Sequence, residues 1–453
     1  MKSLFLEPEK AWQTWSPTPE QPWDIRRAAH LMRRAEFGKP LRELLQDVQR
    51  GYSATIDRLF SMETSPAFDQ SLQPMEKSLS SSQNPKQLAA WWLLRMLQTP
   101  CQLLEKTTLF WHGHFATSAE KVANARAMLR QIELLRSHAL GGFEPMVQGI
   151  ARDVAMLIYL DSQENRKTRP NENFARELME LFCLGPGNYS ERDIKELARC
   201  FTGWEIRRGK FRFNANQHDT GEKNLLGEKG AWGGEKAVGI IVRQSATSRL
   251  IARKLVRFFV CDEAKLTDEL LEPVSCCLRE TDFDLKSVIR MILTSRLFYS
   301  EETIGRKIKS PVELSVGLLR GLGAQDDLNR LADRLFGLGH LPLYPPNVKG
   351  WGGGRQWVNA STYLGRSNLV SAIAHQPDER FAGGSISKAL SIKTQSDPGQ
   401  WVQKLLDHWM AVPVQIETQE QLVRIASAAN RNINQRVADV VSAIGATPEF
   451  QLN

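Results

Sequence analysis

The feature that most constrains this chain is a helical spacing of apolar residues that recurs along most of its length. Residues 24–37, 87–98 and 101–111 each place apolar side chains three and four positions apart, with polar or charged side chains between them. Such a chain buries its apolar stripes by packing helix against helix. We therefore predict an all-α, mainly α-helical fold with at most a small β-hairpin.

N-terminal capping patterns place the starts of two helices. Ser190 with Asp193, and Ser310 with Glu313, are each a hydroxyl residue followed three positions later by an acid, which is the pattern of a capping box. Pro311 strengthens the second start, because proline is favoured in the first helical turn. Helices are expected from 310 onward and at 117–138, 143–158, 172–184, 191–202, 246–260, 264–279, 284–294, 326–337, 398–411, 417–428 and 430–444.

Departures from the helical pattern are few. Residues 205–214 predict a hairpin that turns at Arg208 and Gly209, and the β-branched run 238–242 indicates a short strand. Three further stretches are rich in serine, proline, glycine or other polar residues and predict long loops. These loops are expected at 63–86, 205–245 and 340–368.

The predicted organisation is one large multi-helix body with long loops. Residues 1–22 form an N-terminal extension, residues 23–375 the main helical domain, and residues 376–453 a C-terminal helical part packed on the main body. We find no internal repeat of fixed period, which argues against a solenoid.

The charge pattern does not indicate a nucleic-acid partner. The 453 residues include 59 Lys and Arg against 51 Asp and Glu, a net charge of +8. Basic residues such as Arg33, Arg34, Arg253 and Lys254 recur at helical spacing, as they do on solvated helix faces. No nucleic-acid-binding motif accompanies them.

Hydropathy and cysteine usage predict a cytoplasmic protein without a membrane span. No stretch approaches the roughly 18 apolar residues that a spanning helix needs. Residues 1–22 lack the apolar core of a signal peptide. None of the six cysteines forms a Cys-x-x-Cys pair, and most lie in apolar runs as free thiols do, which favours a reducing compartment.

Two histidines flank a glycine in the segment 110–115. His112 and His114 would point the same way in extended backbone but about 200° apart on a helix, and Gly113 would let the chain leave the helix between them. An extended His-x-His is half of a metal site. The alternative is that both rings pack at a helix end among aromatic residues.

A second candidate is the acidic face of the predicted helix 172–184. Glu177 and Glu180 share one face, and Arg176 lies beside them. The carboxylates could bind a metal, or act as acid and base if their pKa values are pushed apart. The alternative is a solvated face with salt bridges.

A third candidate is the polar loop that begins at His218. His218 and Asp219 could add metal ligands, and Lys223 could hold an anionic group. The alternative is a turn capped by the aspartate.

The fourth candidate is the glycine- and tryptophan-rich loop at 345–357. Its glycines fail the G-x-G-x-x-G spacing, because Arg355 stands where the last glycine is needed. Asn347, Trp351, Arg355 and Trp357 could form a stacking and hydrogen-bonding surface. The alternative is a structured loop that plugs a helical bundle.

Ordered motifs along the chain also resemble a known family, the bacterial domain of unknown function 1800. The resemblance is carried by 29–31 with 37–38, 110–118 (FWHGHFATS), 155–161 (AMLIYLD), 171–184 (NENFARELMELFCL), 189–204, 218–227 (HDTGEKNLLG), 310–314 (SPVEL), 345–351 (PPNVKGW) and 447–451 (TPEFQ).

This resemblance implies a mainly helical protein with no established activity. Many relatives are exported, and their genes often neighbour genes for a sulfatase-like family, which implies a sulfatase-like partner. This chain has Cys183 where many relatives have His, and Gln244-Ser245-Ala246 where many have His-Pro-Ala.

Two functional hypotheses follow. The first is a metal-dependent enzyme with a divalent ion and a His/carboxylate site. Its catalytic residues would be Glu177, Glu180, Arg176 and Lys223, and its metal ligands His112, His114, His218 and Asp219. The second is a non-catalytic binding or assembly protein that acts with a sulfatase-like partner through the Trp351 loop.

Overall fold

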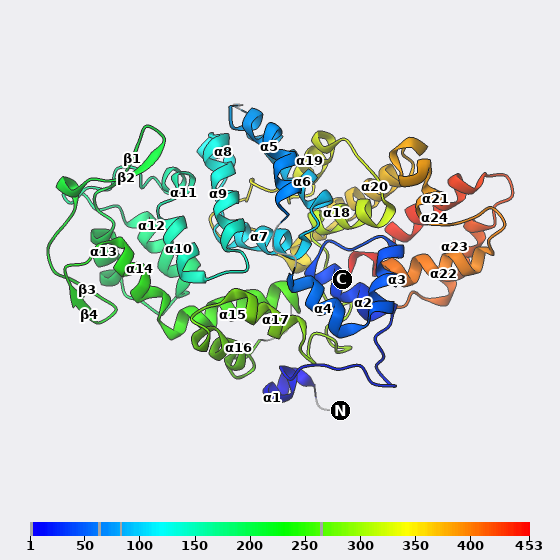
Figure 1. The fold of residues 1–453 in the computed structure, drawn as a ribbon, viewed down its shortest axis with the longest axis horizontal. Coiled ribbons are helices and arrows are strands. Elements are labelled where there is room, and N and C mark those ends of the chain that lie inside the picture. The colour runs from blue at the N-terminus through cyan, green and yellow to red at the C-terminus, as the bar shows by residue number, and fades with distance from the viewer. Residues whose placement is uncertain (1–2, 62–64, 82–83, 263–265) are drawn as a thin grey trace.

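The computed structural model describes residues 3–61, 65–81, 84–262 and 266–453 (Figure 1). Within these ranges the chain is mainly α-helical and carries two small antiparallel sheets of two strands each. The predicted fold class is therefore confirmed. None of the described helices is long and apolar enough to cross a bilayer.

The helices that precede the first sheet are α1 (Pro8–Ala11), α2 (Ile25–Ala35), α3 (Leu41–Arg50), α4 (Tyr52–Ser61), α5 (Pro66–Ser81), α6 (Pro85–Gln98), α7 (Gln102–His114), α8 (Ala119–Val122), α9 (Ala125–His138), α10 (Phe143–Ala151), α11 (Val154–Tyr159), α12 (Glu172–Glu177), the π-helix η2 (Leu178–Cys183) and α13 (Glu191–Cys200). The strands are β1 (Trp204–Arg207), β2 (Lys210–Phe213), β3 (Lys223–Leu225) and β4 (Glu228–Gly230).

The helices that follow are α14 (Gly234–Val242), α15 (Ser245–Phe259), α16 (Asp268–Glu280), α17 (Leu285–Leu293), α18 (Pro311–Leu322), α19 (Leu328–Gly337), α20 (Ala360–Ala374), α21 (Ile386–Ala389), α22 (Pro398–Trp409), α23 (Ile416–Ala426) and α24 (Ile433–Gly445). Short 3-10 turns are η1 (Leu4–Leu6), η3 (Ala215–Gln217), η4 (Gly354–Trp357), η5 (Asp378–Arg380), η6 (Ala382–Gly384) and η7 (Glu449–Gln451).

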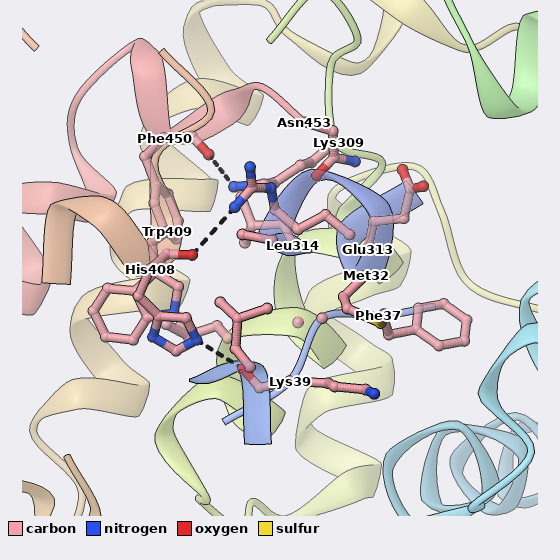
Figure 2. A pocket seen from close by; sticks show the side chains of 16 residues that line it. Met32, Phe37, Lys39, Lys309, Glu313, Leu314, His408, Trp409, Phe450 and Asn453 are labelled. Carbon is pink, nitrogen blue, oxygen red and sulfur yellow. Dashed lines mark hydrogen bonds between the residues drawn. The ribbon is translucent and has the colours of Figure 1, made fainter. Parts of the chain in front are cut away.

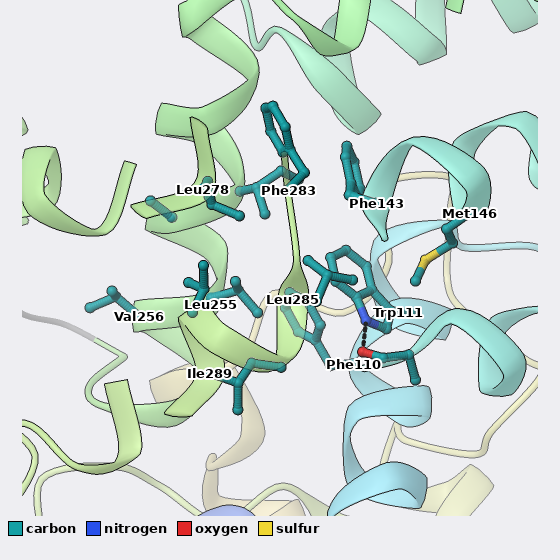
Figure 3. Close-up of a cluster of buried hydrophobic side chains, with 14 of the residues drawn as sticks. Phe110, Trp111, Phe143, Met146, Leu255, Val256, Leu278, Phe283, Leu285 and Ile289 are labelled. Carbon is teal, nitrogen blue, oxygen red and sulfur yellow. Dashed lines mark hydrogen bonds between the residues drawn. The ribbon is translucent and has the colours of Figure 1, made fainter. Parts of the chain in front are cut away.

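Two clusters of buried apolar side chains hold the body together. The first draws on α2, α7, α10 and the helices from η2 to α17, and Figure 3 shows its part around Phe110, Trp111 and Phe143. The Trp111 indole N–H donates to the Ala139 carbonyl at 3.0 Å, so this buried polar atom is satisfied. The second cluster joins α6, α9, α18–α20 and α22–α24.

Helix α7 contributes to both clusters and lies between the two ends of the molecule. Along the long axis, the sheets with α13 and α14 occupy one end, and α22–α24 occupy the other (Figure 1). The candidate residues of α7 are therefore placed where the two cores meet.

The capping signals locate helix starts correctly. Ser190 with Asp193 and Ser310 with Glu313 both form reciprocal capping boxes, at the starts of α13 and α18. The helix predicted over 117–138 is instead two helices, α8 and α9. The break comes at Ala123, whose φ is +48°, and the next residue caps α9.

Three local predictions are wrong. Most of the loop predicted at 63–86 is helix α5. The serines and glutamines of α5 suit the solvent side of a surface helix, while Leu72 and Leu79 are buried. Residues 63–64 and 82–83 lie outside the described residues. The loop predicted at 340–368 ends early, because Asn359 caps α20 from Ala360 onward. The strand predicted at 238–242 is part of α14, since a short apolar run does not distinguish a strand from a buried helix.

The expectation that the basic helix faces are solvated is also wrong for α2. Arg33 is 8% exposed and Arg34 is 1% exposed. The Arg34 guanidinium donates to the Val260 carbonyl, which lies just after α15. The arginine stripe of α2 is therefore an internal feature of the protein.

Candidate functional site

His112 is a buried anchor between α7 and the loop that follows α19. Its Nε2 accepts the Leu343 backbone N–H at 3.0 Å, and its ring packs against those of Trp92 and Trp351. Burial lowers the pKa of His112 to about 3, so the ring is neutral at physiological pH. Because Nε2 accepts, Nδ1 carries the proton.

His114 lies on another side of the same helix and uses both ring nitrogens. Nε2 donates to the Phe182 carbonyl at 3.0 Å, and Nδ1 accepts from Lys254 Nζ at 2.8 Å. Lys254 also donates to the Leu181 carbonyl at 2.8 Å. His114 and Lys254 together satisfy two carbonyls of the π-helix η2, so neither His114 nitrogen is free to bind a metal.

The π-helix is the most unusual local geometry in this region. π-helical turns are rare and often mark functional positions. Burial lowers the pKa of Lys254 to about 8 and raises that of the Cys183 thiol, which lies near it. The Cys183 thiol therefore neighbours a buried amine.

Glu177 and Glu180 are half-buried and close to each other. The Tyr189 hydroxyl donates to Glu180 at 3.2 Å. Burial and the Glu180 carboxylate raise the pKa of Glu177, and Lys349 opposes that rise. The loop after α19 thus brings a cation to this carboxylate pair.

Arg176 is engaged elsewhere. Its guanidinium forms a bidentate ion pair with Glu191 at 2.8 and 2.9 Å and a further ion pair with Glu172 at 3.4 Å. These contacts tie α12 to the first turn of α13, as the salt-bridge alternative anticipated.

The His218–Asp219 segment closes onto α13 rather than α7. His218 Nδ1 donates to the Thr202 carbonyl at 2.8 Å, and Asp219 pairs with Arg199 at 2.7 Å. Lys223 is buried and donates to the Asp219 carbonyl. All three side chains make contacts that fix this loop.

The predicted metal ligands are not assembled in this structure. Within the described ranges, no three His, Cys, Asp or Glu side chains form a group that could hold a metal ion. His112 and His114 serve different neighbours, and His218 and Asp219 are bound to the end of α13 and its following turn.

The glycine- and tryptophan-rich loop docks on the end of α7. Trp357 stacks on His340 with ring centroids 4.7 Å apart, and Trp351 meets the same ring edge-on at 4.6 Å. Asn347 and Arg355 are exposed. This arrangement matches a structured plug for the two tryptophans and leaves the two polar residues on the surface.

Sequence reasoning missed His340 and Lys254 as members of this region. His340 is 5% exposed, and burial lowers its pKa to about 3. It precedes the loop in a glycine- and leucine-rich stretch that carries no ligand spacing. Lys254 occupies a helical stripe with Arg253 and Arg257, where its charge alone predicted solvent exposure.

A basic surface lies at the sheet end of the molecule. In the β1–β2 hairpin, Arg208 and Gly209 form a two-residue turn with φ of +53° and +69°, as in type I′ turns. Cross-strand pairing separates the side chains into two faces. The apolar face consists of Trp204, Ile206, Phe211 and Phe213, and the charged face of Glu205, Arg207, Lys210 and Arg212.

The segment before Pro170 extends this surface. The Ile206 N–H donates to the Gln163 carbonyl at 3.2 Å, and Glu164 forms a β-bridge with Glu205, so residues 163–165 run beside β1 and residues 166–169 follow them directly. We call the exposed cations of this region the basic hairpin surface. They are Arg166, Lys167, Arg169, Arg207, Arg208, Lys210 and Arg212.

Few carboxylates balance the basic hairpin surface. Seven cations stand against Glu164 and Glu205, which pair with Arg166 and Arg212. Arg207, Arg208 and three other cations make no ion pair with the described residues. A hollow of about 450 Å³ is lined by four of these cations, Arg207, Arg208, Lys210 and Arg212. Much of the chain's excess positive charge is therefore gathered here rather than spread over helix faces.

Comparison with known proteins agrees with the motif resemblance. Residues 30–452 match the family described as "Protein of unknown function (DUF1800)". Neither the curated proteins nor the solved structures contain a match. Because the family match spans nearly all of the 453 residues, the chain belongs to this family of proteins of unknown function.

Proposed function

We propose that this protein is a non-catalytic binding protein that docks an acidic surface of a partner protein on its basic hairpin surface. The observation that supports this most directly is the cation-lined hollow at Arg207, Arg208, Lys210 and Arg212. Unpaired cations gathered on one surface attract and orient an acidic surface of a partner. A sulfatase-like protein encoded nearby is the partner that the family resemblance suggests.

The hairpin favours a protein over a single-stranded nucleic acid for a structural reason. Single-stranded nucleic acids are bound by basic residues interleaved with aromatic side chains that stack on bases. Here the aromatic residues of the hairpin lie on the opposite face, where Trp204 packs edge-on to Phe211 at 5.2 Å. The charged face offers ion pairing without stacking.

Several of the predicted catalytic and metal-binding residues make structural contacts, as expected if they do not form a catalytic site. Arg176 and Asp219 each pair with a residue of α13, and Lys223 donates to the Asp219 carbonyl within the loop. His112 and His114 join α7 to the following loop and to η2.

Co-expression with the sulfatase-like protein tests the proposal. The two proteins are expected to co-elute in size-exclusion chromatography at low salt, and the R207E/R208E variant is expected to elute alone. The matched control is K404E/R424E, which reverses two exposed cations on α22 and α23 at the other end of the molecule. Co-elution that survives R207E/R208E contradicts the proposed surface.

One observation favours a second candidate, a divalent-metal site at Glu177 and Glu180. The pKa of Glu177 is raised by burial and, to a smaller extent, by the nearby Glu180 carboxylate. A divalent cation between them would relieve the repulsion between the two carboxylates. Equilibrium dialysis with Mn²⁺ and Zn²⁺ should then give one bound ion per chain, lost in E177Q/E180Q, and absence of binding would reject the candidate.

A further inference from the structure

A small, partly open cavity of about 40 Å³ lies between α2, α18, the end of α22 and the segment after α24 (Figure 2). Its apolar wall includes Met32, Phe37, Leu314, Trp409 and Phe450. Its polar wall consists of Arg33, Lys39, Lys309, Glu313, His408 and Asn453. Such a volume accommodates a few waters or one small ion.

Arg33 brings an uncompensated charge to this cavity. It is 8% exposed, and only its Nη1 has a partner, the His408 carbonyl at 3.1 Å. Nε and Nη2 are buried without a hydrogen-bond acceptor. Burial and the cations Arg34 and Arg26 lower the pKa of Arg33 to about 9, so the guanidinium stays charged at neutral pH.

Lys309 and Arg366 add two more buried cations to the same region. Lys309 Nζ donates to the Phe450 carbonyl at 2.6 Å, and Arg366 donates to the Lys309 carbonyl at 2.7 Å. Neither forms an ion pair with a carboxylate in the described part of the chain. Burial, with Arg33 and Arg366 nearby, lowers the pKa of Lys309 well below its usual value.

The carboxylate that lines the cavity is already engaged by other cations. Glu313 pairs with Lys106 at 2.7 Å and with Lys307 at 3.3 Å, and it accepts the Ser310 N–H at 2.8 Å. The remaining cation of the wall, Lys39, is balanced by Asp47 at 2.8 Å. The charge on Arg33 therefore has no counterpart among the described residues, and buried charges without one are costly.

We propose that the cavity binds one small inorganic oxyanion, phosphate or sulfate. Nε and Nη2 of Arg33 form a fork that matches two oxygens of such an ion. Lys309, whose Nζ is a second nitrogen donor, also lines the cavity, and Asn453 Nδ2, buried without a partner, supplies a further donor. Water could occupy the space, but it would not neutralise the charge.

Calorimetric titration of the full chain tests the proposal. The protein is prepared in chloride buffer without phosphate or sulfate and titrated with each anion at constant ionic strength. One binding event per chain is expected, together with an unfolding midpoint that rises with the logarithm of anion concentration. A response to phosphate alone, to sulfate alone or to both identifies the ion, and no response to either overturns the proposal.

Variants separate anion binding from a structural role of Arg33. R33M is expected to lose the titration heat while its anion-free stability stays equal or rises, because an uncompensated charge is removed. If R33M fails to fold, K309M is expected to show the same loss. The matched control is R306M, which removes an exposed arginine three residues before Lys309. This variant should bind the anion as the wild type does. Undiminished binding in R33M or K309M overturns the proposal.

Discussion

Gly350 packs so closely against Gly113 that a Cβ at position 350 would lie 2.2 Å from the Gly113 carbonyl oxygen. Gly350 also has a φ of +76°, which L-residues with a side chain rarely adopt. This contact seats the loop on α7, where Trp351 and His112 lie against each other. The absence of a side chain at Gly350 is thus required for the loop to dock on α7.

G350A is therefore expected to destabilise the protein by at least about 2 kcal/mol. The left-handed backbone costs a side chain about 1–2 kcal/mol, and relieving the overlap costs a further 1–3 kcal/mol, roughly. Urea unfolding measures the difference. G337A is the control, because a Cβ there meets no atom within 4 Å, and its stability should be unchanged or slightly higher. Equal stability of both variants would contradict the docking account.

Buried neutral histidines should make the protein lose stability in mild acid. Burial lowers the pKa of five of them, His30, His112, His114, His340 and His408. Unfolded histidine has a pKa of about 6.5, so the unfolded state binds more protons below that pH. The free energy of unfolding is expected to fall as pH drops from about 6.5 towards 4.

A variant of His408 tests how much one buried histidine contributes to this pH dependence. The pKa of folded His408 is about 4, so H408Q should reduce the slope of unfolding free energy against pH by up to about 1.4 kcal/mol per pH unit between pH 6 and 4.5. H375Q, at a surface position, serves as the control. A slope that is the same in wild type and H408Q would show that His408 is not kept neutral in the folded protein.

The loss of the buried Lys106–Glu313 ion pair should lower the free energy of unfolding far more than the loss of a surface pair. Both side chains are buried at 1% and 5% exposure, and their charged atoms are 2.7 Å apart. Burial would raise the pKa of Glu313, but Lys106 and Lys307 hold it well below its usual value. K106M leaves a buried carboxylate with one fewer partner and is expected to cost about 3–5 kcal/mol.

The matched control for K106M is K121M, which breaks the exposed pair between Lys121 and Asp161 at 2.8 Å. Exposed pairs contribute about 0–1 kcal/mol, so K121M should leave the unfolding midpoint in urea nearly unchanged. Similar losses in the two variants would mean that burial of the Lys106–Glu313 pair has no special effect.

The fold could be predicted largely because local signals decide it. Helical periodicity and the capping boxes at Ser190 and Ser310 depend on residues close in sequence. Helix α5 was not predicted, because its many polar residues resemble those of a loop. The composition of a surface helix and that of a polar loop overlap.

The site was less predictable because its partners come from distant segments. Periodicity shows that Arg33 and Lys254 belong to polar stripes, but not what covers those stripes. Carbonyls of His408 and Leu181 meet these side chains across long sequence separations. The basic hairpin surface could not be recognised from sequence either, because its first cations follow a segment that pairs with β1 from about 40 residues away.

The salt dependence of partner binding tests the central claim most directly. The dissociation constant of the wild type for the proposed sulfatase-like partner is measured between about 0.05 and 0.2 M salt, alongside R207Q/R208Q. We predict that wild-type affinity falls as salt rises, and that the variant binds more weakly and with a shallower dependence. An affinity that ignores salt, or a variant that binds like the wild type, would contradict recognition through the basic hairpin surface.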